Sequence, residues 1–165
     1  MLSENKKEVI WRGFPRKNKT GFTLIEILIV MAILAILAAA VIIAINPARQ
    51  FAQARNTQRW TAVNSILNAV HQNMADNQGS FNFSGCGATA LPTSATSIAS
   101  TGGVDLCGCL VPTYLASLPY DPTTGSYTDC TNYDSGYTIY QDATSGRITV
   151  AAPAAELNQS ISVTR

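Results

Sequence analysis

The side chains that could do chemistry in this chain are few and widely spaced. His71 is the only histidine, and no Gly-x-Ser-x-Gly, phosphate-loop or His-Glu-x-x-His pattern occurs. His71 also has no Cys, Asp or His at metal-ligand spacing, so we interpret it as an ordinary surface or packed residue. No nucleophile and base constellation emerges, and we expect no enzyme activity.

The cysteines form a second group, which lies in the C-terminal half: Cys86, Cys107, Cys109 and Cys130. In an oxidising compartment this group favours two disulfide bonds. If Cys107 and Cys109 lie on an extended segment, a bond between them would be strained, so each pairs with Cys86 or Cys130, and both orders remain open. A four-thiolate zinc site is the alternative, but Cys-x-Cys lacks the usual two-to-four-residue spacing, so we expect no metal.

Three carboxylates cluster around predicted turns: Asp121, Asp129 and Asp134. Turn formation is the simpler interpretation, because aspartate side chains bond to their own backbone. Their oxygens could hold calcium, yet no fixed-spacing ligand motif is present. We therefore expect no cofactor, and a calcium site near these residues stays open.

The remaining chemical group is Glu26, the one ionisable residue in the 24-residue apolar run 22–45. As a helix this run spans about 36 Å, enough for a bilayer core of about 30 Å. A cleaved signal peptide with Ala38, Ala39 and Ala40 near its cleavage site is the alternative. A 21-residue basic region, an apolar run that continues to Ile45, and a carboxylate costing up to roughly 3.5 kcal/mol in the membrane argue against it.

The residues around Glu26 carry a family resemblance: Lys19-Thr20-Gly21-Phe22-Thr23-Leu24-Ile25-Glu26, followed by the apolar run. This pattern resembles the class III signal of type IV pilins and of type II secretion pseudopilins. The resemblance implies that a membrane-embedded aspartyl peptidase cuts between Gly21 and Phe22 and methylates the new amine. It also implies polymerisation through the apolar helix, on an inner-membrane assembly platform driven by a cytoplasmic ATPase.

The role of Glu26 can be argued from its surroundings. Cleavage leaves a free amine at Phe22, just over one helical turn away, and a carboxylate in hydrocarbon is costly unless it is paired. We expect Glu26 to pair with a mature amine, its own or that of an incoming neighbour, and so to set the register of assembly. The alternative is that Glu26 snorkels to the lipid headgroups.

These groups define three regions. Residues 1–21 form a cleaved leader, 22–46 a membrane-spanning and assembly helix, and 47–165 an exported head. The leader holds six Lys/Arg against two Glu, which predicts a cytoplasmic N-terminus and a single pass through the inner membrane. The remainder holds five Lys/Arg against eight Asp/Glu, a poor match for nonspecific nucleic-acid binding, and we expect no sequence-specific nucleic-acid partner.

The head pattern predicts which elements position these groups. Pro47 predicts a kink near 43–47, and apolar residues at three- and four-residue steps predict a helix over 48–77 that packs through one face: Phe51, Trp60, Val63, Ile66, Leu67, Val70 and Met74. Residues 84–104 are mostly Ser, Thr, Gly and Ala and are predicted to be a loop. The region 107–165 is predicted to hold a short helical turn at the start of 110–122 and an antiparallel sheet with strands over 136–142, 147–152 and around Ile161 and Val163.

The fold class expected is therefore α+β and pilin-like, with a long kinked N-terminal helix packed on a small antiparallel sheet. Pro119-Tyr120-Asp121-Pro122 resembles the Pro-x-Asp-Pro element of major pseudopilins, although the Trp-Gly that commonly follows is absent. The expected function is a structural subunit of a type IV pilus, first in the membrane and then at the cell surface. The alternatives are a pseudopilin of a secretion or DNA-uptake machine, and a monomeric secreted or anchored binding module.

Overall fold

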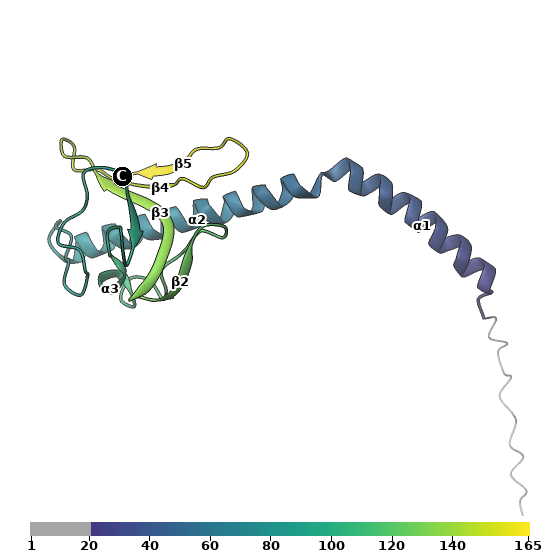
Figure 1. The fold of residues 1–165 in the computed structure, drawn as a ribbon, viewed down its shortest axis with the longest axis horizontal. Helices are drawn as coiled ribbons and strands as arrows, with labels where there is room; N and C mark the ends of the chain where they lie inside the picture. The colour runs from purple at the N-terminus through teal and green to yellow at the C-terminus, as the bar shows by residue number, and fades with distance from the viewer. Residues whose placement is uncertain (1–20) are drawn as a thin grey trace, which may run out of the picture. The chain divides into compact units, whose positions relative to one another are not determined.

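The computed structural model describes residues 21–165 (Figure 1). The expected leader, apart from Gly21, and the basic residues used to orient the chain lie outside the described residues. Two compact units divide the chain, one ending at Ala44 and the other covering Ile45–Arg165. Each is described below by itself.

Helix α1, Leu24–Ile45, lies in the first unit except for its last residue (Figure 1). Its 22 residues span about 33 Å. Leu, Ile, Val, Met and Ala occupy every side of the helix, and none of its residues is buried. It is the one helix among the described residues that is long and apolar enough to cross a membrane. An apolar surface on all sides suits hydrocarbon, or the interior of a bundle, and does not suit water.

Helical structure is interrupted at a single residue, Asn46, which lies in the left-handed region with φ 48°. Its side-chain oxygen accepts a hydrogen bond from the Arg49 backbone N–H at 3.3 Å, so Asn46 caps the next helix. Pro47 occupies the first turn of that helix, where its missing N–H costs nothing. The expected break over 43–47 is therefore confined to Asn46.

The second helix, α2, covers Pro47–Asp76, one residue from the predicted bounds at each end. Its buried face carries the predicted core residues Val63, Ile66, Leu67 and Val70. The expectation that Phe51 and Trp60 join this core was wrong: Phe51 is 64% exposed and Trp60 41%. Three polar residues, Asn56, Arg59 and Asn73, are buried on the helix.

Five antiparallel strands form the sheet. They are β1 (Thr96–Ala99), β2 (Ser126–Asp129), β3 (Asn132–Gln141), β4 (Ile148–Ala152) and β5 (Ile161–Thr164). Their order is β1-β3-β4-β5, and β2 pairs with the first part of β3. The register places Ile139 opposite Val150 and Val150 opposite Val163. The predicted α+β class with a long apolar N-terminal helix and a small antiparallel sheet is thus confirmed.

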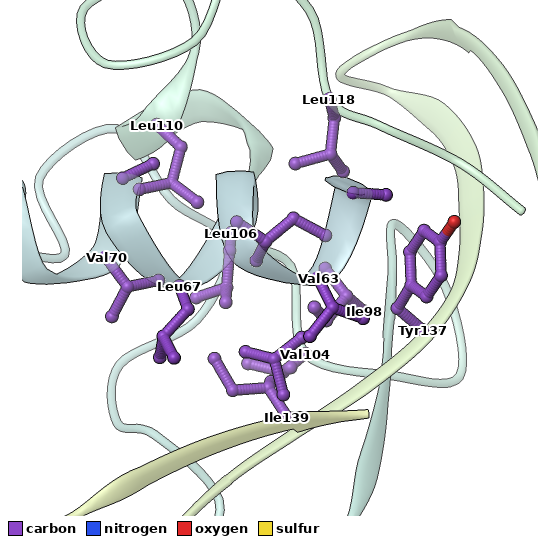
Figure 2. Close-up of a cluster of buried hydrophobic side chains, with 14 of the residues drawn as sticks. Val63, Leu67, Val70, Ile98, Val104, Leu106, Leu110, Leu118, Tyr137 and Ile139 are labelled. Carbon is purple, nitrogen blue, oxygen red and sulfur yellow. The ribbon is translucent and has the colours of Figure 1, made fainter. Parts of the chain in front are cut away.

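The core of the head lies between α2 and the sheet. Figure 2 shows Val63, Leu67 and Val70 of α2 close to Val104 and Ile139, with Leu106 and Leu110 completing the cluster. All of these side chains are less than one-tenth exposed. Burying each large aliphatic side chain stabilises the fold by about 1.5–3 kcal/mol, so this contact holds α2 on the sheet.

Two sequence predictions for the head were incomplete. Residues 84–104 are not all loop, because β1 pairs with β3 and buries Ile98 and Ala99. The segment after β1 returns close to it, because a Cβ at Gly103 would clash with the Ser97 backbone carbonyl. The predicted helical turn falls earlier, as α3 (Cys107–Leu110), and β2 was not predicted.

Candidate processing and assembly site

Three residues of the expected processing and assembly site lie at the start of the described part of the chain. Gly21 is exposed, and apart from its own atoms and its two chain neighbours no described residue lies within 4 Å of the position that a Cβ would occupy. Phe22 is 81% exposed, and Glu26 lies in the first turn of α1. The bond between Gly21 and Phe22 is therefore in an exposed, non-helical segment directly before a helix, where a protease can reach its carbonyl.

Glu26 and Thr23 are joined by reciprocal hydrogen bonds. The Glu26 backbone N–H donates to Thr23 Oγ1 at 3.2 Å, while the Thr23 backbone N–H and hydroxyl both donate to Glu26 Oε2 at 3.3 Å. This is the capping box of a Thr-x-x-Glu sequence, in which each residue satisfies a free group of the other. It also holds a negative charge at the positive end of the helix dipole. Sequence reasoning had identified Glu26 but missed this partner, although the Thr-x-x-Glu spacing was visible.

The family comparison matches this segment. The model of the motif covers residues 16–42, from the basic residues through most of α1. The chain carries a prokaryotic N-terminal methylation motif. The methylation motif is characteristic of type IV pilins and pseudopilins and implies processing by a prepilin peptidase. No curated protein and no solved structure matches the chain.

The methylation motif explains the composition of α1. The large side chains of α1 are exposed, and the helix is long and apolar enough to cross a membrane, so its surface fits a membrane anchor. Ala38, Ala39 and Ala40 are small enough to let helices approach closely. The motif and the helix together support a type IV pilin or pseudopilin, and they fit membrane anchoring through α1.

The head carries two disulfide bonds, Cys86–Cys109 and Cys107–Cys130. Their Cα atoms lie 5.0 and 5.2 Å apart, within the range that a disulfide spans. This connectivity is one of the two disulfide pairings that the sequence left open. The assumption of an extended Cys-x-Cys segment was wrong, because both central cysteines lie on the helical turn α3. The bonds tie α3 to the segment after α2 and to the turn after β2.

The three aspartates considered for calcium do not meet. Asp129 Oδ1 accepts hydrogen bonds from Thr131 and Asn132 in its own turn, and Asp134 Oδ1 accepts one from the Gly136 backbone. Asp121 is buried with Arg59. Within residues 21–165, no three His, Cys, Asp or Glu side chains are grouped so that they could hold a metal ion.

A buried ion pair joins α2 to the loop after α3. Arg59 and Asp121 are both fully buried, and the guanidinium Nε and Nη2 donate to the two Asp121 carboxylate oxygens at 2.6 and 3.2 Å. Nη1 of Arg59 reaches Glu156 Oε2 at 2.8 Å and Asn56 Oδ1 at 2.9 Å, and Nη2 reaches Thr123 at 2.8 Å. One guanidinium thus connects three segments that are far apart in the sequence.

The charges in this network stabilise one another. Burial opposes ionisation of Asp121, but hydrogen bonds from Arg59, Thr123 and Thr124 outweigh it and hold the pKa of Asp121 below its usual range. Hydrogen bonds from Arg55 and Arg59 lower the pKa of Glu156 to about 2. Asp121, Glu156 and the two arginines therefore all stay charged at neutral pH.

The helical spacing in the sequence already indicated that Arg59 is buried. Position 59 is four residues before Val63 and seven before Ile66, so it continues the buried stripe of α2. An arginine on a buried stripe requires a buried acceptor, because an unpaired charge in the interior is very costly.

Proposed function

We propose that this chain is a prepilin, the structural subunit of a type IV pilus. The observation that carries the proposal is the exposed Gly21–Phe22 bond directly before α1, an apolar helix with no buried residue and one carboxylate at its tip. Removing residues 1–21 deletes every lysine of the chain and leaves a subunit that begins with its membrane helix. Such a helix exchanges lipid for identical helices without losing apolar burial.

The head supports an exported location. Its four cysteines are all used in disulfide bonds, which persist in oxidising compartments. We infer a cytoplasmic leader, a single pass over residues 22–46 and a head of residues 47–165 outside the membrane. After assembly the heads form the surface of the fibre. The partners in this proposal are identical subunits, the prepilin peptidase and methyltransferase, and an assembly platform with its cytoplasmic ATPase.

Filament composition tests the proposal. Filaments sheared from cells that express the chain should contain it as the main component, beginning at Phe22. A chain that is processed at Phe22 but absent from surface filaments would favour the pseudopilin alternative. A chain that keeps Met1 would favour the monomeric anchored module.

A blocked variant supplies the matched control. Gly21→Val places a branched side chain beside the scissile bond and should leave the precursor in the membrane without filaments. Gly21→Ala adds only a methyl group, so the peptidase should process it better than Gly21→Val. Equal filament yields from the wild-type chain and Gly21→Val would contradict processing at this bond.

A further inference from the structure

Two segments of the head match the pattern that accepts an asparagine-linked sugar, which is Asn-x-Ser/Thr with a residue other than proline in the middle. They are Asn82-Phe83-Ser84 and Asn158-Gln159-Ser160. No other asparagine after Gly21 is followed two positions later by serine or threonine. The pattern is short and occurs by chance, so the surroundings of each asparagine decide whether an enzyme can use it.

Asn158 lies in the loop that joins β4 to β5 (Figure 1). Asn158, Gln159 and Ser160 are all exposed and lie outside the strands. The backbone of Asn158 is left-handed, with φ 55°, a conformation that asparagine adopts more readily than most residues. The acceptor pattern is therefore at an exposed turn, the kind of position at which surface modification takes place.

The loop is held on α2 at both sides of Asn158. The Glu156 backbone N–H donates to Asn56 Oδ1 at 2.9 Å, and Asn56 Nδ2 donates to the Glu156 carbonyl oxygen at 2.8 Å. The same Nδ2 donates to Gln159 Oε1 at 3.0 Å. In the described part of the chain, none of these bonds uses the Asn158 amide. The fold thus fixes the base of the loop and leaves the Asn158 side-chain nitrogen accessible.

Asn82 is also exposed, but it is tied down on every side. Its Nδ2 donates to Asn77 Oδ1 at 3.1 Å, and its Oδ1 accepts from the Ser84 backbone N–H at 2.9 Å. Its backbone N–H and carbonyl bond to the side chain of Asn73, which is buried on α2, at 2.7 and 3.2 Å. An enzyme would have to break these bonds to use Asn82, so the structure favours Asn158.

We propose that Asn158 is a glycosylation site of the head, modified outside the membrane by a transferase whose donor is a sugar carried on a lipid pyrophosphate. Asn158 Nδ2 attacks the anomeric carbon of this sugar and forms a C–N bond. The bond from that carbon to the pyrophosphate oxygen breaks, the lipid pyrophosphate leaves, and Nδ2 gives up one proton. The inference rests on the proposed function in one respect, because the head must be exported to meet this enzyme.

The mass of one tryptic peptide tests the proposal. Trypsin cleaves after Arg147 and releases the C-terminal peptide 148–165, in which Asn158 is the only asparagine. In the mature chain purified from the cells that produce it, this peptide should be heavier than its sequence by one or more sugar residues, and the intact chain should be heavier by the same amount. Electron-transfer fragmentation should place the sugar on Asn158. An unmodified peptide, or a sugar on one of its serines or threonines, would overturn the proposal.

Variants of Ser160 supply the matched controls, because they leave the asparagine and its turn unchanged. Ser160→Ala destroys the acceptor pattern and should lose the added mass, whereas Ser160→Thr keeps the pattern and should retain it. Ser84→Ala destroys the pattern at Asn82 and should leave the modification of Asn158 unchanged. A sugar that persists in Ser160→Ala, or one that is found on Asn82 in place of Asn158, would refute the assignment.

These outcomes are separate from those that test the pilus subunit. The tryptic peptide 60–147 of the same digest contains all four cysteines, so thiol alkylation before reduction shows whether the head reached an oxidising compartment. A sugar at Asn158 in a chain that forms no filaments would refute the pilus subunit and keep the glycosylation site. Filaments built from a chain with an unmodified peptide 148–165 would do the reverse.

Discussion

Replacing Arg59 with methionine should severely destabilise the head while leaving α1 intact. The change removes a fully buried guanidinium and leaves the Asp121 carboxylate, also fully buried, without its ionic partner. Thr123 and Thr124 still donate hydrogen bonds to Asp121, but neither carries a charge. Breaking a buried pair by removing one partner typically costs about 3–5 kcal/mol.

That loss is large compared with the total stability of a domain, which is about 5–15 kcal/mol. For a head of this size it corresponds to a fall in Tm of about 10–25 °C. Trp60 is the only tryptophan after Gly21 and lies next to Arg59 on α2, so its fluorescence reports the transition directly. The assay is urea unfolding of the full mature chain in detergent micelles, followed by this fluorescence.

Arg55→Met provides the matched control. Arg55 bonds to Glu156 at 2.6 Å, but it is one-third exposed, and surface pairs contribute little. Its loss should therefore be far smaller than that of Arg59→Met. A second variant, Arg59→Met combined with Asp121→Leu, removes both buried charges and should recover much of the stability. An Arg59→Met chain that unfolds within about 1 kcal/mol of wild type would refute this account of the buried pair.

Three further predictions concern Glu156, the cysteines and Glu26. Because the Glu156 pKa is lowered from 4.5 to about 2, its contribution to stability should be present above about pH 4.5 and lost as the pH falls toward 2. Glu156→Gln should therefore make the free energy of unfolding depend less on pH between 4.5 and 2, and an unchanged pH dependence would contradict this role of Glu156. Peptide mapping without reduction should find Cys86 linked to Cys109 and Cys107 to Cys130, and Cys86→Ser should cost roughly 2–5 kcal/mol and increase protease sensitivity, whereas four free thiols or bound zinc would contradict the bonds. Glu26→Leu should be cleaved and folded normally but accumulate in the membrane without filaments, and wild-type filament yield would show that apolar packing alone sets the register.

Helices α1 and α2 could be predicted from sequence because their signals are local. The apolar run, the glycine before it and the isolated carboxylate each have a physical meaning within a few residues of chain. The apolar stripe of α2 likewise identified Val63, Ile66, Leu67 and Val70, because helical periodicity is a local property.

The parts that were missed depend on contacts between distant segments. β1 forms from small residues because β3 lies beside it, and no periodic pattern in 84–104 indicates this pairing. Arg59 is buried because Asp121, 62 residues later, pairs with it. Phe51 and Trp60 follow the helical spacing but are exposed, although Ala52 and Arg59 beside them are buried, since a periodic pattern does not specify how wide the buried face of a helix is.

The most direct test of the account is the intact mass of the chain purified from cells that contain the prepilin peptidase. The account predicts one species that begins at Phe22, carries one methyl group on the new amine and lacks residues 1–21. An amine-reactive probe should label this species only at Phe22, because no lysine follows Gly21. A mature chain that begins at Met1, or after Ala40, would contradict it.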